Sequence, residues 1–130
     1  KERFFHIEFF KTKDDYIAIE YNNRPAGAFA VDVYNFAHST DYFRVYAEVV
    51  NGTFNGLNVD EKYGLASTRR DYKDYVYSDE DIRNKYQDKL KAVLRMPEAF
   101  AELQGDTMYV LVADTLEEMK EMERFVGELK

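Results

Sequence analysis

Four polar side chains near the start of the chain are of types that bind metal ions and phosphate groups. They are Glu8, Glu20, Asn22 and Arg24, and the two glutamates are twelve residues apart. Carboxylate and amide oxygens are hard donors, which suit Mg²⁺ or Mn²⁺ better than zinc or copper. An arginine guanidinium can hold a phosphate or a carboxylate through two parallel hydrogen bonds. The four residue types therefore indicate a magnesium and phosphate site, provided that the fold brings them together.

Two stretches rich in apolar and aromatic residues are predicted to position these side chains on a β-hairpin. Phe4 to Phe10 and Tyr16 to Asn22 have the composition of strands, and the polar residues Lys11 to Asp15 that of a turn. Side chains alternate between the two faces of a strand. We therefore expect His6 and Ala18 to share the face that carries the two glutamates.

Pairing of the two strands would place the glutamates face to face. A loop centred on Asp14 sets Glu8 directly opposite Glu20, with Asn22 one pleat further along. Opposed carboxylates repel each other, and a divalent cation between them reverses the sign of the interaction. The same alternation also fits a solvated sheet face that carries charges, and a slip of one residue would undo the pairing. Periodicity alone leaves both interpretations open.

The sequence around these residues resembles the ATP-grasp superfamily of ligases. Glu8 stands in FHIEFF and Glu20 in IEYNNRPAG, and the hairpin of that superfamily supplies a Glu followed by Glu-x-Asn-x-Arg. The resemblance implies that Glu8, Glu20 and Asn22 bind Mg²⁺ (or Mn²⁺), which bridges the phosphates of ATP. It also implies that Arg24 helps to bind ATP and is catalytic, because it would contact the transferred phosphate or the substrate carboxylate.

The segments RPAG and VDVYNFA look most like carboxylate–amine ligases and biotin-carboxylase-like enzymes of this superfamily. Such a ligase uses ATP to convert a small carboxylate into an acyl phosphate, and an amine or similar nucleophile then displaces the phosphate. A carboxylate–amine ligase is the first expectation, and a biotin-carboxylase-like or carbamoyl-phosphate-synthase-like ligase the second. The alternatives from other classes are a non-catalytic interaction module derived from an ATP-grasp half, and a small Ca²⁺- or Mg²⁺-binding domain.

The resemblance extends only to the metal-binding half of an ATP site. Strand-like residues begin at Phe4, directly after the start of the chain, and we therefore expect an upstream ATP-grasp subdomain in the same natural polypeptide. That subdomain would hold the rest of the nucleotide, so the chain on its own is expected to be inactive. A homodimer is compatible with this organisation.

The rest of the pattern predicts an α+β fold in two parts. Residues 1–56 are expected to be the C-terminal part of an ATP-grasp domain, and residues 57–130 a small α+β subdomain. After the hairpin we expect a helix over Phe29–Ala37, then a helix capped at Ser39, Thr40 or Asp41 that ends at Gly52 and buries Tyr42, Val45, Tyr46 and Val49. The second part should contain strands over Tyr63–Arg69 and Tyr75–Ser78, a helix from Ser78, a strand or helix over Leu90–Met96, a helix from Pro97 to Gly105 and a strand over Thr107–Ala113. The last helix is expected to have a capping box at Thr115 and Glu118 and an inner face reaching Leu129.

Composition excludes several classes of protein. The net charge of −7 argues against a nucleic-acid-binding surface, and the absence of cysteine excludes a disulfide framework or a cysteine-ligated metal. No apolar run approaches the length of a membrane span, and a cytoplasmic location is expected. His6 could approach a ligand or act as a base, although a lone histidine is more often structural.

Overall fold

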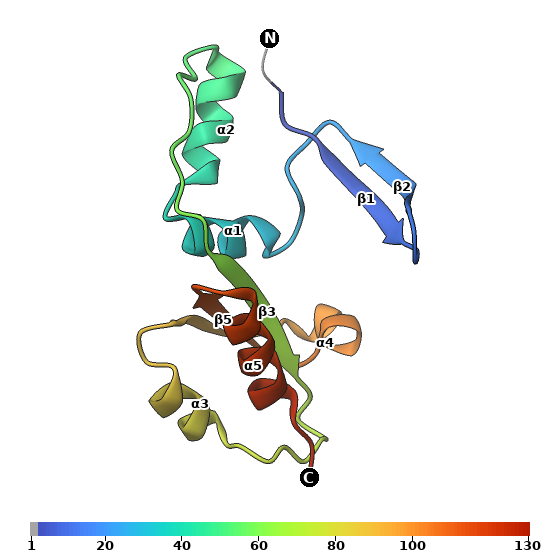
Figure 1. Ribbon diagram of the computed structural model, residues 1–130, viewed down its shortest axis with the longest axis vertical. Helices are drawn as coiled ribbons and strands as arrows, with labels where there is room; N and C mark the ends of the chain where they lie inside the picture. The colour runs from blue at the N-terminus through green and yellow to red at the C-terminus, as the bar shows by residue number, and fades with distance from the viewer. Residues whose placement is uncertain (1–2) are drawn as a thin grey trace.

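The computed structural model describes residues 3–130 as a mixed α+β fold with two separate antiparallel sheets (Figure 1). One sheet is a two-stranded hairpin, and the other has three strands in the order β3-β5-β4. The elements are β1 (His6–Lys11), β2 (Tyr16–Asn22), α1 (Ala30–His38), α2 (Tyr42–Asn51), β3 (Tyr63–Arg69), α3 (Asp79–Lys85), β4 (Leu90–Arg95), α4 (Glu98–Gln104), β5 (Thr107–Ala113) and α5 (Leu116–Gly127).

The hairpin projects from the end of the molecule that carries α1 and α2 (Figure 1). Its turn is closed by bonds between Thr12 and Asp15, each of which donates a backbone N–H to the other residue over 2.9 Å. Nearly all the side chains of both strands are exposed, including Phe10 at 65% and Tyr21 at 61%. The hairpin is therefore held mainly by its own ladder and not by a core.

Helices α1 and α2 follow as a pair with well-defined ends. Asp41 is the N-cap of α2 and accepts a hydrogen bond from the N–H of Arg44, as one of the three predicted caps. Gly52 ends the helix with φ of 73°, a conformation that glycine adopts without strain. The predicted buried stripe is confirmed at Val45, but Tyr46 is 44% exposed.

The three-stranded sheet holds the main core of the described chain, because β5 is covered on both faces. On one face, a cluster packs against α3 and α5; it comprises Ile82, Tyr86, Tyr109, Leu111, Ala113, Met122 and Val126. On the other face, Met108, Val110 and Met96 pack with residues from α1 and the segment before it. The alternation along β5 thus divides its side chains between two helical layers.

Helix α1 approaches the sheet closely at a glycine. A Cβ atom added at Gly64 of β3 would lie 2.6 Å from Val33 Cγ1 and 3.2 Å from Ala37 Cβ. Only a residue without a side chain permits this contact. The first helix after the hairpin is therefore packed directly on the sheet of residues 63–113, while the predicted division at residues 56 and 57 stays a prediction.

Three predictions about the C-terminal half need correction or refinement. The expected strand at Tyr75–Ser78 is wrong, because Tyr75 forms only an isolated bridge with Leu129. Leu129 consequently lies beyond α5 and not on its inner face. Residues Leu90–Arg95, for which periodicity left both options open, form β4. Pairing with β5 decides this, since no local signal distinguished the two states.

The capping box predicted for the last helix is formed only in part. Thr115 accepts from the N–H of Glu118 at 3.2 Å, but the Glu118 carboxylate accepts from the N–H of Asp114 and not from that of Thr115. A complete capping box is found at the start of α3, between Ser78 and Asp81. None of the helices formed by residues 3–130 combines the length and apolar character needed to cross a membrane.

Candidate metal and phosphate site

The two predicted glutamates lie opposite each other on the hairpin. Glu8 of β1 is the cross-strand partner of Glu20 of β2, and His6 is the partner of Asn22. Asn22 Nδ2 donates to Glu20 Oε1 at 2.7 Å, and His6 Nε2 lies 3.7 Å from Glu8 Oε1. The predicted pairing is thus confirmed, and four polar side chains share one face of the sheet.

A β-bulge produces this pairing. Near the turn, Phe9 pairs with Ala18, and a register shift follows between Phe9 and Glu8. If the pairing continued without the shift, Ile19 would stand opposite Glu8 and the two glutamates would point to opposite faces. The extra residue therefore aligns the carboxylates, which is a common use of bulges near functional sites.

The bulge also corrects one predicted side-chain position. Ala18 was expected on the face of Glu20, but its partner Phe9 points to the opposite face from Glu8 because β1 alternates regularly. The ring of Tyr16 contacts that of Phe9 edge-on, at 6.3 Å between centroids. The face opposite the carboxylates is therefore apolar and aromatic near the turn.

Arg24 follows the end of β2 and is not joined to the carboxylates. Its Nη1 donates to the carbonyl of Pro25 at 3.0 Å, and the side chain is exposed. The hairpin thus brings together Glu8, Glu20 and Asn22, and leaves the predicted catalytic arginine beside them in the loop after the strand. Among the described residues this carbonyl is its one hydrogen-bond acceptor, so the guanidinium keeps donors free for an anion.

The donor set fits a hard divalent cation in kind. Two directly opposed carboxylates are destabilising on a sheet unless a positive charge lies between them, and the side chain of Glu8 is half-exposed. The oxygen of the Asn22 amide would complete a set of oxygen ligands, which is what magnesium prefers. Within residues 3–130, no three His, Cys, Asp or Glu side chains form a group that could hold a metal ion, so a metal site here would need the Asn22 amide as well.

No family model matches the chain, and no curated protein or solved structure matches it.

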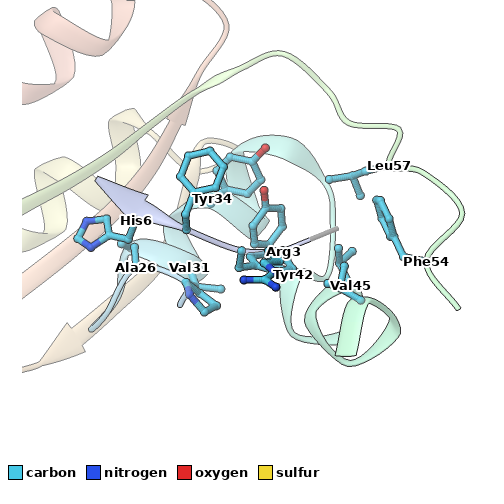
Figure 2. A pocket seen from close by; sticks show the side chains of 14 residues that line it. Arg3, His6, Ala26, Val31, Tyr34, Tyr42, Val45, Phe54 and Leu57 are labelled. Atoms are coloured by element: carbon cyan, nitrogen blue, oxygen red, sulfur yellow. The ribbon is translucent and has the colours of Figure 1, made fainter. Parts of the chain in front are cut away.

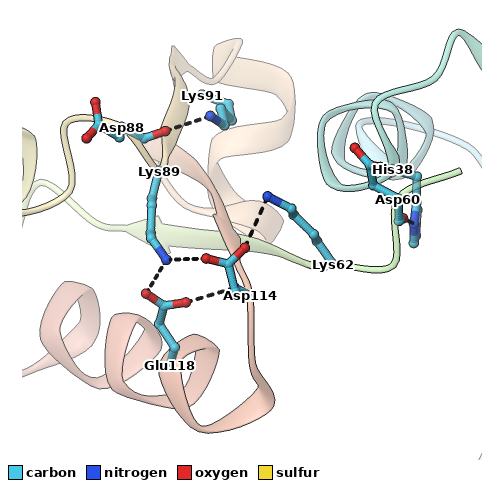
Figure 3. A network of polar contacts seen from close by, with 8 residues as sticks. All are labelled: His38, Asp60, Lys62, Asp88, Lys89, Lys91, Asp114 and Glu118. Carbon is cyan, nitrogen blue, oxygen red and sulfur yellow. Dashed lines mark hydrogen bonds and ion pairs between the residues drawn. The ribbon is translucent and has the colours of Figure 1, made fainter.

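A second polar cluster joins the ends of β3, β4 and β5 to α5 (Figure 3). Lys89 Nζ contacts both Asp114 Oδ2, at 2.9 Å, and Glu118, while Lys62 Nζ lies 3.1 Å from Asp114 Oδ1. The hydrogen bond from Lys89 holds the pKa values of Asp114 and Glu118 below their usual range. Both carboxylates are paired with lysine side chains, so the cluster stabilises the packing of these elements.

Sequence reasoning missed a cavity that adjoins the carboxylate face (Figure 2). Its volume is about 710 Å³, and its walls come from the segment before β1, from α1 and α2, and from the segment after α2. His6, predicted on the carboxylate face and found there, also lines this cavity. The residues that build the cavity are far apart in the sequence, and their pattern carries no signal that distinguishes a cavity from a core.

Proposed function

We propose that the hairpin is a magnesium site and that the chain is the C-terminal part of an ATP-grasp ligase. One observation carries the proposal: Glu8 and Glu20 are cross-strand partners, with Asn22 bonded to Glu20 on the same face. This arrangement is unfavourable without a cation. It offers the oxygen donors that the order Glu, then Glu-x-Asn-x-Arg, supplies in the superfamily.

In this proposal the chain supplies ligands and positive charge to a phosphoryl transfer. Glu8, Glu20 and Asn22 would hold Mg²⁺ (or Mn²⁺), which would neutralise charge on the phosphates of ATP. Arg24 would stabilise the transferring phosphoryl group and the acyl phosphate. An amine or similar nucleophile then displaces the phosphate. Proposed partners are ATP, a small carboxylate and an upstream subdomain of the same polypeptide.

Within the superfamily we favour a cytoplasmic carboxylate–amine ligase, because the sequence from Arg24 onwards resembles that group of enzymes. A biotin-carboxylase-like or carbamoyl-phosphate-synthase-like ligase is the second choice. A different function, that of a non-catalytic interaction module, is favoured by the exposed apolar side chains of the hairpin. Phe5, Phe10 and Tyr21 are each more than 60% exposed, and such a surface is typical of a region that another polypeptide covers.

The test is a titration of Mg²⁺ and Mn²⁺, with and without ATP, followed by thermal unfolding. A ligand that binds only the folded state raises its stability by RT ln(1 + [L]/Kd), about 2.7 kcal/mol at a hundredfold excess over Kd. Glu8→Gln and Glu20→Gln should abolish the rise because each removes a charged ligand. Glu117→Gln, an exposed glutamate of α5, is the matched control and should respond like the unmodified chain.

Three outcomes distinguish the candidates. A rise that is lost only in the two hairpin variants supports the ligase. A larger rise in thermal stability when Ca²⁺ is titrated in place of Mg²⁺, unchanged by ATP, favours a calcium-binding domain. If metal changes the thermal stability of none of the variants, in this chain or in a longer polypeptide with an upstream subdomain, the interaction module is favoured.

A further inference from the structure

The cavity beside the carboxylate face has the size of a small-molecule site. Its volume of about 710 Å³ falls within the roughly 300–1,000 Å³ that ligand sites occupy. His6 and Ala26 stand at one end of it, and Phe54 and Leu57 at the other (Figure 2). The cavity is thus elongated, and only one end lies near the hairpin.

That end of the cavity adjoins the proposed magnesium site through His6. His6 lines the cavity, and its Nε2 is 3.7 Å from Glu8 Oε1. Pro25 and Ala26, which also line it, directly follow Arg24. A ligand lying in the cavity with one end at His6 would therefore present that end to the residues proposed to hold magnesium and phosphate.

The charge of the cavity is opposite to that of the chain. The whole chain has a net charge of −7, yet none of the described residues lining the cavity is Asp or Glu. The described lining includes the guanidinium of Arg3 and the imidazole of His6, whose Nδ1 is buried without a hydrogen-bond partner in the described structure. Such a lining favours an anion.

The walls of the cavity are aromatic and hold each other in place. Phe4 meets Tyr42 edge-on, with 5.2 Å between ring centroids, and Tyr34 packs against Tyr42 at 4.4 Å. Burial and the hydrogen bond with Tyr34 raise the pKa of Tyr42, so the Tyr42 hydroxyl stays protonated at physiological pH. Rings in these orientations suit a flat aromatic group better than a flexible chain.

We propose that this cavity binds an aromatic carboxylic acid, with its ring between α1 and α2 and its carboxylate on the side of Arg3 and His6. The further step, that this acid is the carboxylate which the ligase activates, rests on the proposed function, because only a ligase would use the acid as a substrate. Binding itself depends on the cavity alone and needs neither metal nor nucleotide. It can therefore be tested separately from the magnesium site.

Fluorescence anisotropy with indole-3-propanoate gives a direct test. The chain has no tryptophan, so indole emission reports only the probe. A ligand with about 14 non-hydrogen atoms and ordinary ligand efficiency binds with Kd of about 1 mM or lower. Indole-3-propanamide, which has the same shape without the charge, should bind at least about tenfold more weakly, because charged hydrogen bonds are the stronger ones.

Paired variants locate the probe. Val49→Phe, in α2, would fill part of the cavity and should weaken binding at least about tenfold, whereas Val50→Phe places the same ring on the exposed side of α2 and should change it less than about twofold. Arg3→Gln should weaken binding of the acid about tenfold and leave the amide unchanged. Lys73→Gln, an exposed lysine of the 70–78 segment, is its charge-matched control.

Folding of each variant is checked by NMR, and Ala30→Phe, which narrows the cavity from the start of α1, replaces Val49→Phe if that variant unfolds. Equal binding of acid and amide, or equal effects of Val49→Phe and Val50→Phe, would overturn the proposal. So would the absence of binding at about 10 mM probe. If the acid binds in the cavity while the metal titration fails, the cavity site stands and its role as a substrate site falls.

Discussion

The hairpin and the three-stranded sheet are both antiparallel, yet they are stabilised in different ways. Strand β5 is buried along almost its whole length between two helical layers, whereas β1 and β2 are exposed along theirs. A two-stranded hairpin without a packed face is only marginally stable in water. The carboxylates of the candidate site thus lie on the region with the least packing, and regions of low local stability often carry function.

The difference in packing between the sheet and the hairpin can be tested by removing one apolar side chain from each region. Leu111 is fully buried in β5, so Leu111→Ala should lower the free energy of unfolding by about 2–5 kcal/mol through lost burial and a residual cavity. Ile17, which is 58% exposed on β2, should lose no more than about 0.5 kcal/mol as Ile17→Ala. Urea unfolding measures both, and similar losses would mean that the hairpin is packed in solution.

The contact of α1 with the sheet can be tested at one glycine. Gly64→Ala should cost about 1–3 kcal/mol, because its Cβ would meet Val33 Cγ1 at 2.6 Å and the helix must move to relieve the clash. Gly127→Ala is the control, since nothing lies within 4 Å of its added Cβ. Thermal unfolding of the two variants gives the comparison, and an unchanged Gly64→Ala would contradict the close approach.

The polar cluster around Lys89 should make the C-terminal sheet sensitive to acid. The pKa values of Asp114 and Glu118 are lowered by the hydrogen bond from Lys89, and a lowered folded-state pKa stabilises the fold above the ordinary value and loses this effect as pH falls. Lys89→Met should therefore be less stable than the unmodified chain above about pH 4.5, and the difference should close towards pH 2. Because these groups are partly or fully exposed to solvent, the effect is small.

Unfolding midpoints in urea at several pH values measure this difference. Lys91→Met is the matched control, because Lys91 Nζ donates only to the carbonyl of Asp88 in the described structure and should show no comparable pH dependence. A difference between the Lys89→Met and unmodified chains that stays constant down to pH 2 would assign the effect to packing of the lysine stem.

The smallest expected effect is the most specific to the hairpin. Without metal, Glu8→Gln should stabilise the hairpin by about 0.2–1 kcal/mol, because it removes one of two directly opposed charges. With Mg²⁺ the sign should reverse, since the variant has lost a ligand. Hydrogen exchange of the hairpin amides measures both states. A loss of stability without metal would show that the two carboxylates do not repel across the ladder.

Local chemistry made the helix ends and the hairpin predictable. Asp41 before α2 and Gly52 after it were identified because a short polar side chain and a residue free to take positive φ are required there. The opposition of Glu8 and Glu20 was also predicted, but the assumed even spacing about Asp14 did not include the bulge at Ile19. No residue type in that segment announces a bulge, since Ile19 and its neighbours all suit a regular strand.

The sequence alone determined the residue types of the candidate site, their order and the alternation that puts Glu8 and Phe9 on opposite faces of β1. These follow from backbone periodicity, which each short segment carries by itself. Only the tertiary structure decided that Leu90–Arg95 is a strand, that Tyr75 forms no strand, and that α1 lies on Gly64. It alone built the cavity beside His6. Such features depend on contacts between residues far apart in the chain, which no local pattern encodes.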